Sequence, residues 1–144
     1  RTLHQDYSRI TMDLQNLAYA AAQVIHNFGA VTVVGGAACA LAWRDTTVQR
    51  RLAWIVLAGW AIQATSGATF GAISYYYYGK FPDIHGIAVA ALSVKLVCAA
   101  LGFTLAVWQL FIYPPAASSR NAWLGVFILG ALALSSAAVL RWFS

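Results

Sequence analysis

Charged residues are scarce in this chain of 144 residues. Asp, Glu, Lys and Arg together make up 9% of it, whereas soluble domains carry roughly 25%. Hydrophobic residues make up 61%. So few charges cannot cover a surface that faces water, which excludes a soluble globular domain. The composition instead predicts an integral, multi-pass membrane protein whose main partner is the lipid bilayer.

Acids and sulfur-containing residues are also few. The chain has four Asp and Glu in total, two Cys, one Met and three His. It therefore offers no obvious carboxylate pair for acid–base catalysis, and an enzyme that works alone is not expected. Copper(I) sites favour thioether and thiolate ligands, but Met12 lies outside the apolar runs. Cys39 and Cys98 lie in separate apolar runs and are expected to be small buried residues.

The net charge of +5 comes from small basic clusters and not from a continuous basic stripe. This pattern argues against nucleic acid as a partner. Cationic loops beside apolar spans are typical of contact with anionic lipid headgroups. The densest cluster, Arg44, Arg50 and Arg51, predicts a cytoplasmic loop, with both termini outside a bacterial inner membrane.

Four long apolar runs predict four membrane-spanning helices and no β-strand. Each run reaches the roughly 20 residues that cross about 30 Å of hydrocarbon. The expected spans are 17–43, 52–74, 83–113 and 122–141, where residues 1–16 form a polar lead and 17–144 a four-span membrane domain. Pro82 is expected to open the third span, and Pro114 and Pro115 to end it. The predicted fold is all-α: an up-and-down transmembrane four-helix bundle.

Three ionisable residues in or beside the spans are candidate functional residues, because burying such groups in lipid is costly. They are His26, His85 and Lys95. The first and third spans run in the same direction and are expected to be diagonal in the bundle, roughly 12–14 Å apart. Imidazole is a natural axial ligand of haem iron. These residues therefore predict a haem b site with His26 and His85 as metal ligands and Lys95 deeper in the same site.

Two further observations bear on this haem hypothesis. The small residues Gly29, Ala30, Gly86 and Ala90 lie within about a turn of the two histidines and could make room for a porphyrin. On the expected spans, however, His26 lies deeper than His85 by up to about 9 Å, at 1.5 Å per residue. The depth difference argues against a shared iron, so an interfacial hydrogen-bonding role for each histidine stays open.

Polar and small residues on the second span predict how it packs. Gln63, Ser66 and Phe70 follow a spacing that places them on one helix face. A primary amide has no hydrogen-bond partner among acyl chains, so Gln63, Ser66 and Gly67 are expected to face the bundle interior. Gly67 and Gly71 form a small-xxx-small pattern, which predicts close contact with another helix.

The run His26-Asn-Phe-Gly-Ala-Val-Thr-Val-Val-Gly35-Gly36 resembles the first signature helix of CopD-like membrane proteins. The later Val94-Lys95-Leu96-Val97 resembles the Lys-Leu start of a second signature helix in that group, and is similar to the setting of a lysine in HemJ-like proteins. The resemblance covers about 30 residues. It implies a redox or metal-related membrane role for His26 and Lys95.

Three functions remain open from the sequence. The first is a b-type cytochrome-like electron-transfer subunit of a respiratory or redox complex, in contact with other membrane subunits. The second is a non-enzymatic accessory subunit of a larger membrane complex. The third is copper handling of the CopD-like kind. A visible absorption spectrum would separate the first from the other two, because only bound haem gives a Soret band.

Overall fold

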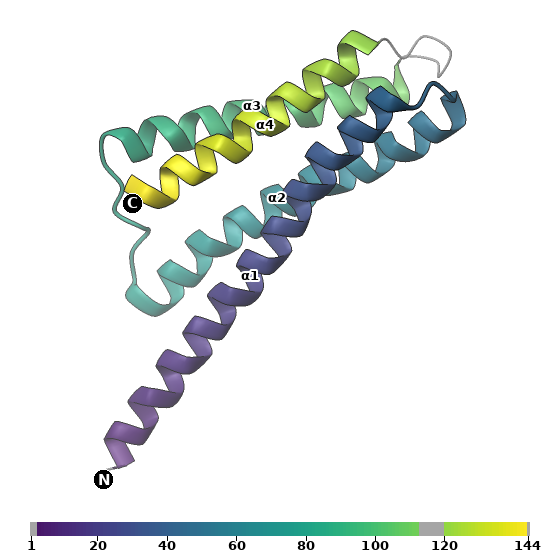
Figure 1. Cartoon of the computed structure of the whole chain (residues 1–144). Helices are drawn as coiled ribbons and strands as arrows, with labels where there is room; N and C mark the ends of the chain where they lie inside the picture. Colours follow the sequence, from purple (N-terminus) through teal and green to yellow (C-terminus); the bar gives the residue numbers. More distant parts are fainter. Residues whose placement is uncertain (1–2, 113–119, 144) are drawn as a thin grey trace.

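The computed structural model describes residues 3–112 and 120–143, with side chains from residue 10 onward. These residues form four helices and no strand: α1 (Leu3–Ala42), α2 (Thr46–Tyr78), α3 (Ile87–Phe111) and α4 (Arg120–Phe143). The all-α prediction is confirmed. Successive helices run in opposite directions, as an up-and-down bundle requires (Figure 1). The helices pack as two hairpins, α1 with α2 and α3 with α4.

Three of the described helices are long and apolar enough to cross a membrane: Ile10–Ala42 of α1, and all of α3 and α4. The helix α2 falls short because Arg, Gln, Thr, Ser and Tyr interrupt its apolar residues. It nevertheless lies antiparallel along α1 (Figure 1). That α2 crosses the membrane therefore stays a prediction. Its packing along α1, which is long and apolar enough to span, supports this prediction.

Helix α1 begins well before the predicted first span. Its 40 residues extend about 60 Å, roughly twice the thickness of the hydrocarbon layer. From Leu3 onward the polar lead is therefore helical and continuous with the span. The N-terminal end of α1 lies beyond α3 and α4 (Figure 1). Within this extension, Gln15 Nε2 donates to the hydroxyl of Tyr78 in the last turn of α2 at 2.7 Å.

The third helix begins later than predicted. Pro82 does not open it, because residues 79–86 form a non-helical connection and α3 starts at Ile87. Gly79 (φ 67°) ends α2 in the left-handed region, and Gly86 (φ 53°) turns the chain into α3. Both positions favour glycine because a Cβ would be strained there. The predicted stop at Pro114 and Pro115 lies outside the described residues.

Small residues bring α1 and α2 together. A Cβ added at Gly29 would lie 3.2 Å from the carbonyl oxygen of Gly59, and one at Gly36 would lie 2.7 Å from Val56. The predicted pair on α2 behaves differently: a Cβ on Gly67 or Gly71 would make only ordinary contacts, at 3.9 Å and 3.6 Å. The closest contact between α1 and α2 is therefore made by other glycines than the predicted pair. The space beside Gly29 is filled by α2, so it leaves no room for a porphyrin.

Small side chains also dominate the core. The buried cluster joins all four helices and contains Val33, Ala37, Ala40, Ala53, Val56, Trp60, Cys98, Ala106, Trp123, Val126 and Ala133. Small residues suit a membrane bundle because helices in lipid associate mainly through close packing. Cys98 is buried as expected, whereas Cys39 is exposed on α1.

Candidate ligand-binding site

His26 lies at the centre of a hydrogen-bonded chain across the bundle. Its Nδ1 is 2.8 Å from Ser66 Oγ on α2, and its Nε2 is 2.9 Å from Lys95 Nζ on α3. Only 7% of His26 is exposed. The helices α1 and α3 are diagonal, as predicted, because α1 packs on α2 and α4 and α3 packs on the same two. The residue that reaches His26 across this diagonal is Lys95.

The chain has a defined direction. An ammonium group carries three donors and no acceptor, so Lys95 donates to Nε2 of His26. The imidazole then carries its proton on Nδ1 and donates it to Ser66 Oγ. The hydroxyl of Ser66 donates in turn to the backbone carbonyl of Ile62. Both ring nitrogens of His26 and the hydroxyl of Ser66 therefore have partners within the protein, which lowers the cost of burying them.

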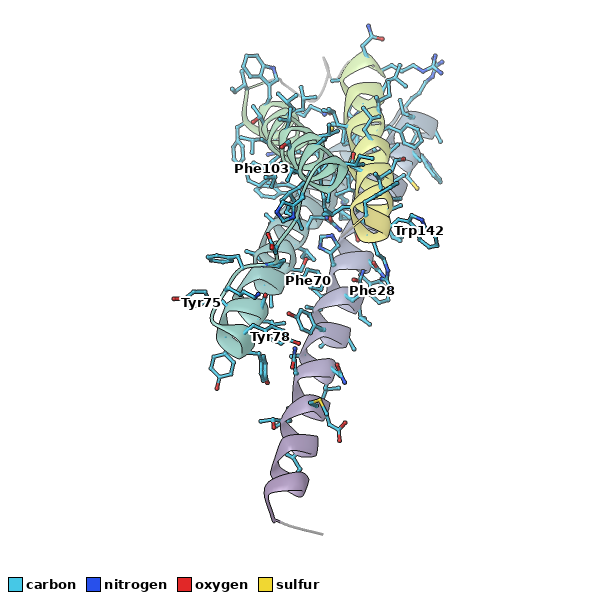
Figure 2. The ribbon with its side chains drawn as sticks, turned by 90° about the vertical axis from the view of Figure 1, so that its left-hand side faces the viewer. Phe28, Phe70, Tyr75, Tyr78, Phe103 and Trp142 are labelled. Atoms are coloured by element: carbon cyan, nitrogen blue, oxygen red, sulfur yellow. The ribbon has the colours of Figure 1, made fainter. Side chains whose placement is uncertain are left out.

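Other residues of α1 and α2 hold the His26 ring in place. Gln63 donates its amide to the backbone carbonyl of His26. Phe70 packs edge-on against the imidazole at a centroid distance of 5.8 Å, and Tyr19 stacks on Phe70 at 6.2 Å. Figure 2 shows Phe70 on the side of α2 that faces α1. The prediction that Gln63 and Ser66 face the bundle interior is confirmed.

His85 takes no part in the hydrogen-bonded chain around His26. It lies in the connection between α2 and α3, where its Nε2 is 3.4 Å from Asp83 Oδ1, and both side chains are largely exposed. The prediction that His85 opens the third helix is wrong, because residues 81–85 have no regular secondary structure and α3 begins only after Gly86. Asp83, one of the four acids of the chain, is exposed with it.

The donor set does not fit an axial histidine pair. Axial ligation needs a free ring nitrogen on each histidine, yet Ser66 and Lys95 occupy both nitrogens of His26. Among the residues that the structure describes, no group of three or more His, Cys, Asp or Glu could hold a metal ion. The haem b hypothesis therefore stays a prediction of the sequence.

A cleft opens beside His26 between α1, α2 and α4, with a volume of about 280 Å³. Its lining residues are Gln23, His26, Asn27, Ala30, Val33, Trp60, Gln63, Gly130, Ala133, Leu134, Ala137, Ala138 and Arg141. Eight of these thirteen residues are apolar or glycine. The five polar ones are Gln23, His26 and Asn27 of α1, Gln63 of α2 and Arg141 of α4. The cleft thus combines apolar walls with a few placed polar groups.

The polar groups lie toward one end of the cleft. Gly130 of α4 meets α1 at Val33, since an added Cβ would lie 2.9 Å from Val33 Cγ1. Arg141 lies eleven residues after this contact and Gln23 ten residues before it on the antiparallel α1, so both lie about 15 Å from it along the helices. His26 and Asn27 lie between. The cleft is polar where α4 ends and apolar toward the Gly130–Val33 contact.

The cleft and the place of Arg141 in it were not predicted from the sequence. Gln23 and Asn27 are amides within the first span, and their spacing of four residues places them on one face. Counting residues back from the end of the first span and forward from the start of the fourth would have placed Arg141 at nearly the same depth as Gln23. The convergence of α1 and α4 could not be predicted, because it depends on the contact at Gly130.

Comparisons with known proteins do not identify a family for this chain. No protein-family model, no curated protein and no solved structure matches it. The resemblance to CopD-like and HemJ-like proteins therefore rests on the sequence motifs alone, and the function has to be inferred from the site.

Proposed function

We propose that this chain is a non-enzymatic accessory membrane protein that takes an apolar small molecule from the bilayer into the cleft between α1, α2 and α4. The observation that carries the proposal is the cleft itself, with His26 fixed in its wall. Ligand sites are concave and mostly apolar, with a few polar groups that orient the ligand. The volume of about 280 Å³ lies just below the usual range of roughly 300–1,000 Å³, which suits a small or partly inserted ligand.

The direction of the hydrogen-bonded chain supports binding over catalysis. A histidine that activates a serine must accept the serine proton. Here Lys95 occupies the accepting nitrogen of His26, and the imidazole donates to Ser66. Ser66 also lies deep in the bundle with only 4% of its surface exposed. The Ser66–His26 pair is therefore arranged as a fixed polar support and not as a nucleophile with its base.

Binding can be tested with decanol and the purified full-length protein in phosphatidylcholine nanodiscs. We expect saturable binding, measured by calorimetry, with at least a tenfold loss of affinity in Ala137→Phe, because the new ring fills the cleft. Val139→Phe is the matched control, since Val139 lies on the same helix, is 39% exposed and does not line the cleft. No binding to the wild type, or equal loss in both variants, would refute the proposal.

The same preparation tests the electron-transfer alternative. A cleft that holds an apolar molecule without iron gives a protein with no absorption in the visible range, so we expect no Soret band after purification with haem supplied during growth. A Soret band that is lost in His26→Ala but kept in His85→Ala would show haem on His26 alone. That result would replace the binding proposal with a redox one.

We also propose the orientation in the membrane. Arg44, Arg50, Arg51 and Arg120 all lie at the end of the bundle where α1 ends and α4 begins. Asp45 lies among them, but its carboxylate accepts from the backbone N–H groups of Thr47 and Val48 as the cap of α2. A concentration of arginine in short loops favours the cytoplasmic side. A carboxy-terminal alkaline phosphatase fusion is therefore expected to be active, and a fluorescent GFP fusion at that end would contradict this orientation.

A further inference from the structure

The charged groups around the cleft are all positive. Arg141 lines the cleft at the end of α4, and no described carboxylate forms an ion pair with it. Lys95 lies directly behind the His26 ring, at 2.9 Å from Nε2. The described acids are Asp13, Asp45 and Asp83, and none of them lines the cleft. A cleft lined by one arginine, with a lysine just behind its wall and no described acid in its lining, attracts a negatively charged ligand.

The polar atoms left over at this end of the cleft also suit an anion. Gln23 Nε2 donates to Asn27 Oδ1 at 2.8 Å, which leaves the amide N–H groups of Asn27 free to donate to a ligand. The guanidinium of Arg141 presents a planar fork of donors that matches a carboxylate or a phosphate. Both residues lie at the polar end of the cleft, one on each side of it, since α1 carries Asn27 and α4 carries Arg141.

The opposite end of the cleft is lined mainly by apolar atoms. Its walls there are Ala30 and Val33 from α1, Trp60 from α2, and Gly130, Ala133 and Leu134 from α4. The two ends are about 15 Å apart along α4, at 1.5 Å per residue. A ligand that satisfies both ends has one anionic head and one extended apolar chain.

We propose that the ligand of this cleft is a single-chain amphipathic anion, with its carboxylate on Arg141 and Asn27 and its chain between Trp60 and the alanines of α4. This inference rests on the proposed function and adds the chemical class of the ligand. The nearby Lys95 contributes a favourable potential through His26 without touching the head. The occupant is a fatty-acid-like molecule. The experiment below distinguishes it from an anionic phospholipid, which shares the charged head and the apolar chain.

The test compares decanoate with decanol, which share one chain and differ in the charge of the head. In phosphatidylcholine nanodiscs we expect the wild-type protein to bind decanoate about tenfold more tightly than decanol, which corresponds to about 1.4 kcal/mol. Arg141→Gln should abolish this preference, so that the variant binds decanoate no more tightly than decanol. Arg120→Gln, at the other end of α4, is the matched control and should keep the preference.

Each other outcome has a defined meaning. Equal binding of decanoate and decanol by the wild type, or a preference that survives in Arg141→Gln, overturns the anionic-head inference while the cleft still binds apolar molecules. Failure of both molecules to bind overturns the proposed function itself. Displacement of decanoate by phosphatidylglycerol in mixed nanodiscs, but not by phosphatidylcholine, would show that the occupant is an anionic phospholipid and would overturn the fatty-acid assignment.

Discussion

Replacing Gly102 with alanine is expected to destabilise the bundle by about 3 kcal/mol, the upper part of the usual range for overpacking a core. The added Cβ would lie 2.6 Å from Cε2 and 3.0 Å from Nε1 of Trp60, and still closer to Cζ2. Trp60 is 3% exposed and packs in the core cluster, so its ring has little space into which to move. The measurement is the free energy of unfolding by steric trapping in nanodiscs or bicelles.

Two further variants make this prediction specific. Gly35→Ala is the matched control, because an added Cβ at Gly35 meets no atom within 4 Å. It should leave stability unchanged or raise it slightly, since alanine is the better helix former by about 1 kcal/mol. Trp60→Phe combined with Gly102→Ala should recover part of the loss. A Gly102→Ala protein as stable as the wild type would show that α2 and α3 do not meet at this contact.

The second large effect concerns His26 and Lys95. Lys95→Met or His26→Phe alone is expected to destabilise the protein by about 2 kcal/mol, because each leaves a buried polar partner unsatisfied. The double variant should cost clearly less than the sum of the two. We expect a coupling energy of about 1–2 kcal/mol, toward the upper end for hydrogen bonds between membrane helices.

The control for this cycle pairs Lys95→Met with Thr104→Val. Thr104 lies on the same helix, and its hydroxyl donates to the carbonyl of Ala100 in the preceding turn of that helix. Its effect should add to that of Lys95→Met within about 0.5 kcal/mol. Additive effects of His26→Phe and Lys95→Met would mean that the two side chains do not interact across the bundle.

The sequence predicts the helical architecture well because hydrophobic runs of this length have few other solutions in a membrane. It predicts the ends of helices less well. The first helix starts at Leu3, since polar residues such as Gln5 and Asp6 do not prevent a helix from continuing into water. The third starts at Ile87, since the two glycines with positive φ, Gly79 and Gly86, hold the intervening chain outside the helices.

The candidate site, too, could be predicted from the sequence only in part. Burial cost alone singles out His26 and Lys95 as functional candidates, and the structure brings their side chains together. Their partner on α2 could be predicted only as far as the face that carries Gln63 and Ser66. The exclusion of His85 could not be predicted, because it depends on the path of residues 79–86. The cleft depends on contacts between helices far apart in the sequence, which periodicity does not encode.

Aromatic residues lie in the last turns of α2 and α4. Tyr75 points away from α1 and Trp142 projects from the end of α4 (Figure 2). Trp142 is 85% exposed. Tyrosine and tryptophan are common at membrane–water interfaces, where the ring is half-buried and its polar atom contacts water. Trp142 lies at the same end of α4 as Arg141, so we expect the polar end of the cleft to lie near a membrane surface.

The central claim is that the cleft beside His26 receives an apolar chain, and photo-crosslinking tests it most directly. A decanol analogue with a diazirine at the chain end, activated in nanodiscs and followed by peptide mapping, should label residues around Val33, Trp60 and Leu134. Excess decanol should prevent this labelling, and Ala137→Phe should abolish it. Labelling confined to outward-facing positions of α3 such as Leu96 and Leu101, unaffected by competitor, would contradict the account.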